Sequence, residues 1–105
     1  MIKFVSDKNF NEMLSGAKPV VLVDFFATWC GPCKMLGKEL ELLAEDMPEL
    51  DILKIDTDQC PELSQKFNID AVPTMIVFKD RKAMARTEGY LPAATLKSKL
   101  EDFFR

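Results

Sequence analysis

The sequence contains no histidine. This absence excludes Ser-His-Asp and Cys-His catalysis, together with the usual zinc enzymes. No run approaches the roughly 20 apolar residues that a membrane span requires, and Met1 to Phe10 lacks the apolar stretch of a secretory signal. The three cysteines are too few for a disulfide-stapled scaffold, and their odd number leaves one unpaired. Basic charge is not in excess: the net charge is −3, whereas nucleic-acid-binding domains carry a basic patch.

What remains is the composition of an ordinary globular domain. Apolar residues make up 48% of the 105 residues and charged residues 30%. A chain of this length buries roughly 60–70% of the surface that its unfolded form exposes, which is enough for a core. We therefore expect one domain over residues 1–105. We expect it to be a monomer, with neither nucleic acid nor a membrane as a partner.

The strongest secondary-structure signal is the run from Val20 to Ala27. Seven of its eight residues are apolar, and they do not alternate with polar ones. This pattern predicts a strand covered on both faces, as in the middle of an α/β sheet. A helix follows, with Pro32 in its first turn and its end at Pro48. Its apolar stripe is formed by Leu36, Leu40, Leu43 and Met47.

The remaining elements are shorter. Strands are predicted over Ile2–Val5, Leu50–Asp56, Thr74–Phe78 and Ala83–Glu88. Helices are predicted from a cap at Ser6 or Asp7 through Leu14, over Pro61–Phe67 and over Pro92–Phe104. The order βαβαβαββα predicts parallel strands wherever a helix separates two strands, and an antiparallel hairpin at the end. The expected fold class is α/β, with a central mixed five-stranded sheet flanked by four helices.

The segment Trp29-Cys30-Gly31-Pro32-Cys33-Lys34 joins the central strand to its helix. The N–H groups at a helix N-terminus stabilise a thiolate, and we expect Cys30 to lie exposed at this end. Cys33 is one turn further along, three residues before Leu36, and should be shielded by the apolar stripe. This asymmetry predicts that Cys30 attacks a substrate disulfide. Cys33 then attacks the Cys30 sulfur in the mixed disulfide and releases the reduced substrate.

The two residues between the cysteines tune the pair. Gly31 allows a tight bend, Pro32 stiffens it, and neither adds positive charge. Because a histidine here would favour an oxidant, the pair is typical of a reductant. Three alternatives are half of a zinc site, a permanent structural disulfide, and idle cysteines in a degenerate fold. A zinc site needs four ligands, and only Cys60 and carboxylates remain to complete it. The scarcity of cysteine also favours a reducing compartment.

This hexapeptide matches the active-site motif of the thioredoxin family. The Val-Asp-Phe strand before it, Val72-Pro73-Thr74, and Gly89 ahead of the last helix match as well, so the sequence resembles that family over the whole chain. The resemblance implies the thioredoxin fold, a redox disulfide Cys30–Cys33, and a cytoplasmic protein-disulfide reductant that acts as an electron carrier. It implies no bound cofactor or metal. Electrons would come from NADPH through a thioredoxin reductase, and disulfide-containing substrate proteins would be the other partners.

Two further functional interpretations stay open. The protein could be a dedicated reductant for one partner. It could also be a non-enzymatic binding or scaffold subunit, for which the cysteine chemistry would be dispensable.

Asp24 is the only polar residue in the apolar strand. Its side chain either faces solvent at an edge of the sheet or is buried. Burial raises the pKa of a carboxyl because desolvation disfavours its charge, which would make Asp24 the candidate base for Cys33. The resemblance implies the same role. Lys54 matches a family lysine that approaches this aspartate and would tune it. The alternative is a plain surface lysine.

Pro73 stands at the head of a strand, where proline removes no ladder hydrogen bond. By resemblance it should be a cis proline that faces the active site and leaves the Val72 backbone free to pair with an extended substrate segment. The alternative is an ordinary trans proline. Gly31 and Pro32 would join a small, mostly apolar contact face. The substrate-binding residues that the resemblance implies are Trp29, Val72, Pro73, Thr74 and Gly89.

Two further positions, Phe26 and Cys60, are relevant to the site and its chemistry. Phe26 stands where many members of the family have tryptophan. Cys60, the odd cysteine, precedes Pro61, the first residue of a short predicted helix. It is either a half-buried spacer or a thiol that reaches solvent and forms an intermolecular disulfide or accepts glutathione. It should not bridge to Cys30 or Cys33, because its helix follows a different strand and a disulfide needs Cα atoms within about 7 Å.

Overall fold

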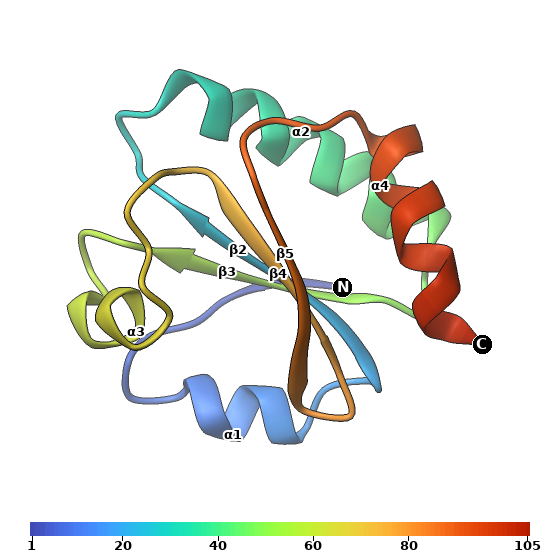
Figure 1. Cartoon of the computed structure of the whole chain (residues 1–105), viewed down its shortest axis with the longest axis horizontal. Coiled ribbons are helices and arrows are strands. Elements are labelled where there is room, and N and C mark those ends of the chain that lie inside the picture. Colours follow the sequence, from blue (N-terminus) through green and yellow to red (C-terminus); the bar gives the residue numbers. More distant parts are fainter.

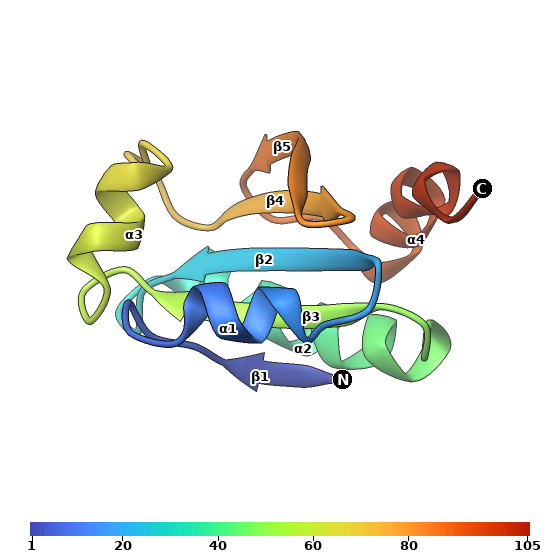
Figure 2. The same cartoon turned by 90° about the horizontal axis from the view of Figure 1, so that it is seen from below.

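The computed structural model describes all 105 residues and contains one five-stranded sheet. Across the sheet the strands lie in the order β1-β3-β2-β4-β5, which can be followed from bottom to top in Figure 2. Strands β1, β2 and β3 are parallel, and β4 runs antiparallel to both β2 and β5. The strand bounds are Ile2–Phe4 for β1, Val20–Phe26 for β2, Asp51–Asp56 for β3, Thr74–Lys79 for β4 and Lys82–Glu88 for β5.

Four helices cover the two faces of this sheet. Helices α1 and α3 lie on one face, and α2 and α4 lie on the other (Figure 1). Their bounds are Phe10–Ser15 for α1, Gly31–Asp46 for α2, Pro61–Lys66 for α3 and Ala93–Glu101 for α4, followed by a 3-10 turn over Asp102–Phe104. None of these helices combines the length and the apolar composition that a membrane crossing demands. The predicted element order and the α/β fold class are confirmed.

Strand β2 lies at the centre and supplies side chains to both cores. Val21, Val23 and Phe25 point into the core under α1 and α3, whereas Val20 and Leu22 point into the core under α2 and α4. The second core also contains the apolar stripe of α2, as predicted. The run of apolar residues without alternation therefore reflects a strand that is buried on both sides.

The expectation of parallel pairing across every helix is wrong for β4, which runs antiparallel to β2. The reason is the position of α3, which stays at the end of the sheet where β3 finishes (Figure 1) and does not carry the chain back along the sheet. The chain therefore starts β4 at the end of the sheet where β3 finished.

The N-terminal segment also differs from the prediction, because α1 starts later and has no side-chain cap. Ser6 and Asn9 bond to each other instead: the Ser6 N–H donates to Asn9 Oδ1 (2.8 Å), and the Asn9 N–H donates to Ser6 Oγ (3.3 Å). Asp7 caps a different helix. Its carboxylate accepts the backbone N–H groups of Glu62 (3.2 Å) and Leu63 (2.9 Å) in the first turn of α3.

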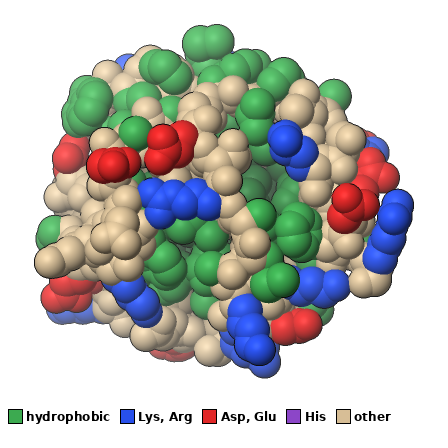
Figure 3. Space-filling model, viewed as in Figure 1, with side chains coloured by type: hydrophobic (Ala, Val, Ile, Leu, Met, Phe, Trp, Pro, Cys, Tyr) green, Lys and Arg blue, Asp and Glu red, His purple; other side chains and the backbone are tan.

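The last two strands form the predicted hairpin. Its two-residue loop consists of Asp80 and Arg81, which both have positive φ (50° and 69°), as a type I′ turn requires. Strand β5 is the exposed edge of the sheet, with six of its seven residues exposed. Figure 3 views the molecule from the same side as Figure 1 and shows hydrophobic side chains gathered across the middle of this face, with charged ones mostly around them. In the final turn Phe103, and not Phe104, packs against the core.

Candidate active site

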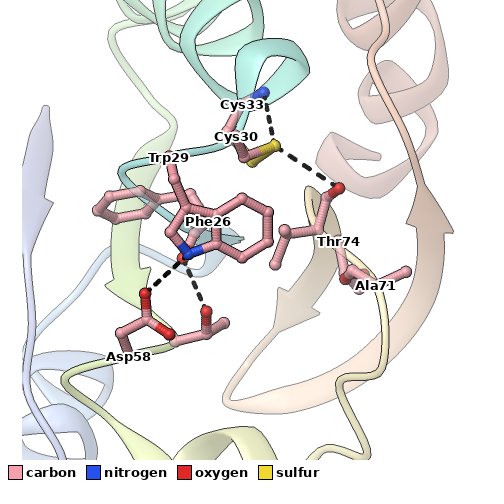
Figure 4. Close-up of a disulfide and its surroundings, with 9 residues drawn as sticks. Phe26, Trp29, Cys30, Cys33, Asp58, Ala71 and Thr74 are labelled. Carbon is pink, nitrogen blue, oxygen red and sulfur yellow. Dashed lines mark hydrogen bonds between the residues drawn. A yellow bond between two sulfur atoms is a disulfide. The ribbon is translucent and has the colours of Figure 1, made fainter.

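Cys30 and Cys33 form a disulfide just after the end of β2, with their Cα atoms 5.2 Å apart. Cys30 is the N-cap of α2, and Pro32 occupies its first turn as predicted. The backbone N–H of Cys33 donates to Cys30 Sγ at 3.2 Å (Figure 4). Once the disulfide is reduced, an N–H in this position stabilises the negative charge of a Cys30 thiolate, as does the positive end of the helix dipole.

The expectation that Cys30 is exposed is wrong, since Cys30 is only 5% exposed and Cys33 3%. Trp29 and Gly31, its neighbours in sequence, are exposed, but Cys30 Sγ itself lies 3.7 Å from the carbonyl oxygen of Val72. The two sulfurs therefore differ in what they face rather than in exposure. Cys30 faces the Val72 carbonyl, and Cys33 lines a pocket on the side of α2 that faces β1 and β3.

The loop before β4 builds the wall opposite the disulfide. The Val72–Pro73 peptide bond is cis, as the resemblance implied, and Pro73 is buried. Thr74 Oγ1 donates to the Ala71 carbonyl at 2.6 Å (Figure 4), and the Gly89 N–H donates to the Pro73 carbonyl at 2.8 Å. Gly89 has a φ of 91°, a conformation that glycine adopts readily and other residues rarely do. These bonds join the loop to the end of β5 and hold the Val72 carbonyl in place.

Trp29 lies at the exposed rim of the site, as predicted, with 69% of its surface accessible. Its indole Nε1 donates to Asp58 Oδ2 at 3.0 Å, so the ring is fixed beside the disulfide (Figure 4). Asp58 belongs to the loop after β3 and was not a predicted site residue. Nothing in the sequence distinguishes it from Asp56 in the same segment, because the bond to Trp29 spans 29 residues of chain.

Asp24 is completely buried in β2, and neither of its carboxylate oxygens has a hydrogen-bond partner. The interpretation that it faces a wet edge is therefore wrong. Desolvation raises the pKa of the Asp24 carboxyl from 3.8 to about 6, and the charge of Lys54 opposes part of that rise. A carboxyl with a pKa near 6 exchanges protons close to neutral pH, which is the property that a base for Cys33 needs.

Lys54 lies directly across the β2–β3 ladder from Asp24. Its ammonium stands over the rings of Phe26 (4.8 Å from Nζ to the centroid) and Phe4 (5.4 Å), within the range of cation–π attraction. It is half-buried and lines the same pocket as Cys33, which measures about 430 Å³. The interpretation of Lys54 as a plain surface lysine is therefore wrong. Neither aromatic ring was expected to contribute to the site.

Cys60 is free, as expected, but it is only 2% exposed and its thiol donates to the Val5 carbonyl at 3.7 Å. The interpretation of a thiol that reaches solvent is wrong, because Asp7 holds the start of α3 against the N-terminal segment and closes the core over Cys60. Desolvation raises the pKa of the Cys60 thiol, and the nearby charges of Asp7 and Asp56 add to this rise.

We expect Cys60 to be unreactive in the native protein. A thiol reagent should modify no cysteine in the folded, oxidised protein and one per chain after denaturation. In the reduced protein Cys60 should react roughly 100-fold more slowly than an exposed cysteine, because reaction requires local opening of the segment around α3. Prompt labelling of Cys60, or a disulfide-linked dimer through Cys60 after mild oxidation, would contradict this expectation.

The fold and the site together define a class of protein. A reversible cysteine pair at the N-terminus of a helix, opposite a cis-proline loop, is the apparatus of a dithiol/disulfide oxidoreductase. Both cysteines of the pair are engaged with each other. No group of three or more Cys, Asp and Glu side chains is arranged to hold a metal ion, so the structure gives no support to a zinc site.

Comparisons with known proteins define the family. A family model described as Thioredoxin matches residues 1–102. Thioredoxin from Chlamydia trachomatis is 45% identical over 89 residues, 85% of each chain, and thioredoxin from Staphylococcus haemolyticus is 46% identical over 99 residues, 92% of each. A crystal structure of chloroplastic thioredoxin z is similar with a TM-score of 0.89 at 36% identity, over 98% of this chain and 94% of that one. This chain belongs to the thioredoxin family, and dithiol/disulfide exchange at Cys30–Cys33 makes it a protein-disulfide oxidoreductase that needs no bound cofactor.

Proposed function

We propose that this protein is a general protein-disulfide reductant, recharged by a thioredoxin reductase with electrons from NADPH. The observation that carries the proposal is the hydrogen bond from the Cys33 N–H to Cys30 Sγ at the start of α2. A thiolate stabilised in this way is the attacking group of the proposed exchange. The absence of a histidine between the two cysteines favours reduction over oxidation of substrates.

The proposed exchange moves two electrons in two steps. The Cys30 thiolate attacks one sulfur of a substrate disulfide, the substrate S–S bond breaks, and its other sulfur leaves as a thiolate that takes a proton. Cys33 then gives its proton to Asp24, and the Cys33 thiolate attacks Cys30 Sγ. The second substrate sulfur leaves, and the protein is left with the Cys30–Cys33 disulfide. A reductase restores the dithiol by the reverse exchange.

Substrate docking is proposed to use the wall opposite the disulfide. The Val72 carbonyl lies 3.7 Å from Cys30 Sγ, so an extended substrate segment that pairs with the Val72 backbone would bring its own disulfide to that sulfur. The exposed Trp29 ring, with Gly31 and Pro32, would cover the segment from the other side. Such a site binds the backbone of the substrate segment more than its side chains, which suits a reductant with many substrates. We propose further that the protein works as a monomer in the cytoplasm, a compartment that keeps thiols reduced.

The test is turnover of a generic protein disulfide in the presence of NADPH and a thioredoxin reductase. We expect NADPH consumption that requires all three components and stops in the Cys30→Ser/Cys33→Ser double variant. The same variant separates the other interpretations. A scaffold role would survive the double substitution, and a dedicated reductant would reduce one partner but not the generic disulfide. Failure of reductases of different types to support turnover would contradict the proposed recharging.

A further inference from the structure

A row of directly paired residues crosses the sheet from the edge strand β1 to the buried carboxylate of Asp24. Phe4 in β1 pairs with Lys54 in β3, and Lys54 pairs with Asp24 in β2. Directly paired residues of neighbouring strands project from the same face of a sheet, so the three side chains share one face. That face is the one covered by α2, because Leu22, two residues before Asp24, packs against the α2 stripe.

The Lys54 ammonium is held on several sides. Phe4 and Phe26 pack edge to face, with centroids 5.9 Å apart and an interplanar angle of 78°, and Nζ stands over both rings. On the opposite side it approaches α2 at Gly37, where an added Cβ would lie 3.5 Å from Nζ. Phe4 keeps this position although it is 68% exposed, so burial of its own surface does not explain its presence here.

We propose that Phe4 and Phe26 form an aromatic seat that positions Lys54 beside Asp24, and that Phe4 is thereby a positioning residue for the attack of Cys33 on the mixed disulfide. The inference rests on the proposed role of Asp24 as the base. Asp24 has no hydrogen-bond partner, so the nearby positive charge is the interaction that favours its ionised form. No ion pair or hydrogen bond fixes the Lys54 ammonium, which leaves the two rings to define where that charge lies.

Other charged groups around this pocket have a weaker electrostatic effect on the Asp24 carboxyl. Lys34, Lys38 and Glu41 of α2 line the pocket, but their side chains are exposed and are screened by water and salt. Asp56 shares a face with Lys54 and accepts the Asp58 N–H at 3.0 Å. On the other side of β2, the residue paired with Asp24 is the uncharged Met75. Lys54 is therefore the half-buried cation that acts on Asp24.

The sign of the effect follows from this arrangement. Without the Phe4 ring, the long Lys54 side chain is free to extend into solvent past the short edge strand. Its attraction for the Asp24 carboxylate then weakens, and the pKa of Asp24 moves higher. The base form of Asp24 appears only at higher pH, so the step carried out by Cys33 slows near neutrality while attack by Cys30 is unchanged.

The experiment compares Phe4→Leu with Phe4→Tyr. Leucine retains apolar bulk without an aromatic face, whereas tyrosine keeps the face. The Asp24 carboxyl is titrated by NMR, and the rate of the Cys33 step is followed from pH 5 to 9 with a disulfide peptide. We expect Phe4→Leu to raise both midpoints by about half a pH unit, the size expected for one exposed cation–π contact. Phe4→Tyr and a remote substitution, Phe104→Leu, should match the wild type.

Lys54→Met provides the reference for complete loss of the cation and should raise the Asp24 midpoint further. An Asp24 midpoint unchanged in Phe4→Leu but raised in Lys54→Met would overturn the aromatic seat. Equal shifts in Phe4→Leu and Phe4→Tyr would overturn it as well, because they would indicate a packing effect. Loss of disulfide reduction in the wild type at every pH is a different result, which would contradict the proposed function instead.

Discussion

The Cys33→Ser variant should accumulate a stable mixed disulfide between Cys30 and its substrate proteins. A serine hydroxyl does not attack a disulfide, so the intermediate formed by Cys30 has no route to completion within the chain. Catalytic turnover should fall to the uncatalysed rate while the first step proceeds normally. Non-reducing electrophoresis of the variant after mixing with disulfide-containing proteins, followed by mass spectrometry of the linked peptides, measures this outcome.

Cys30→Ser should trap almost nothing. The two cysteines are almost equally buried, so this expectation rests on their different surroundings. Cys30 Sγ accepts a hydrogen bond from the Cys33 N–H and faces the Val72 carbonyl, where substrate is proposed to dock. Cys33 instead lines the pocket on the side of α2 that faces β1 and β3. Cys60→Ser is the matched control and should behave as the wild type does. Equal trapping by Cys30→Ser and Cys33→Ser would reverse or remove the assigned roles.

Asp24→Asn should make the protein more stable at neutral pH. Because the folded protein raises the pKa of Asp24 from 3.8 to about 6, it holds this proton more tightly than the unfolded chain does. The stability associated with the proton is complete below pH 4 and is lost as the pH rises through 6, by about 3 kcal/mol in total. Asparagine carries no charge at any pH. The free energies of unfolding of the two proteins should therefore agree near pH 4 and differ by up to about 3 kcal/mol at pH 7.

Urea unfolding at a series of pH values measures this difference directly. Wild-type stability relative to Asp24→Asn should decline between pH 4 and pH 7, and parallel curves would show that the pKa of Asp24 is the same in the folded protein as in the unfolded chain. A second measurement addresses catalysis. Asp24→Asn should slow the Cys33 step near neutral pH and remove its dependence on a group with a pKa near 6. If the variant retained the wild-type rate and pH profile, Asp24 would not be the base.

Features set by local pattern could be predicted from the sequence, and those set by distant contacts could not. Strand β2 follows from its continuous apolar run and the buried face of α2 from its helical apolar spacing. The antiparallel direction of β4 depends on where α3 lies relative to the sheet, which its own residues do not reveal. The cap that Asp7 provides to α3 and the bond between Trp29 and Asp58 both join residues far apart in the chain, so no neighbouring residue reveals them.

The cysteines show the same limit at the site itself. The helix N-terminus was visible in the spacing of the motif, and the structure places Cys30 at that point. The burial of Cys30 could not be predicted from the motif, because the loop around Val72 that covers it lies some 40 residues further along the chain. The resemblance to a family supplied the cis bond before Pro73, which no pattern of residue types establishes. It did not supply the aromatic seat under Lys54, which depends on the strand pairing that places Phe4 of β1 beside Lys54 of β3.

The two edges of the sheet bear on aggregation. A strand with unpaired backbone groups is a template for another chain, and long flat edges promote assembly into extended sheets. Here β1 is three residues long. Strand β5 carries Lys82, Arg86 and Glu88, and its pairing with β4 contains a bulge between Val77 and Phe78. Short length, charge and irregular register each oppose edge-to-edge addition. The native fold therefore discourages the pairing of one copy's sheet edge with that of another.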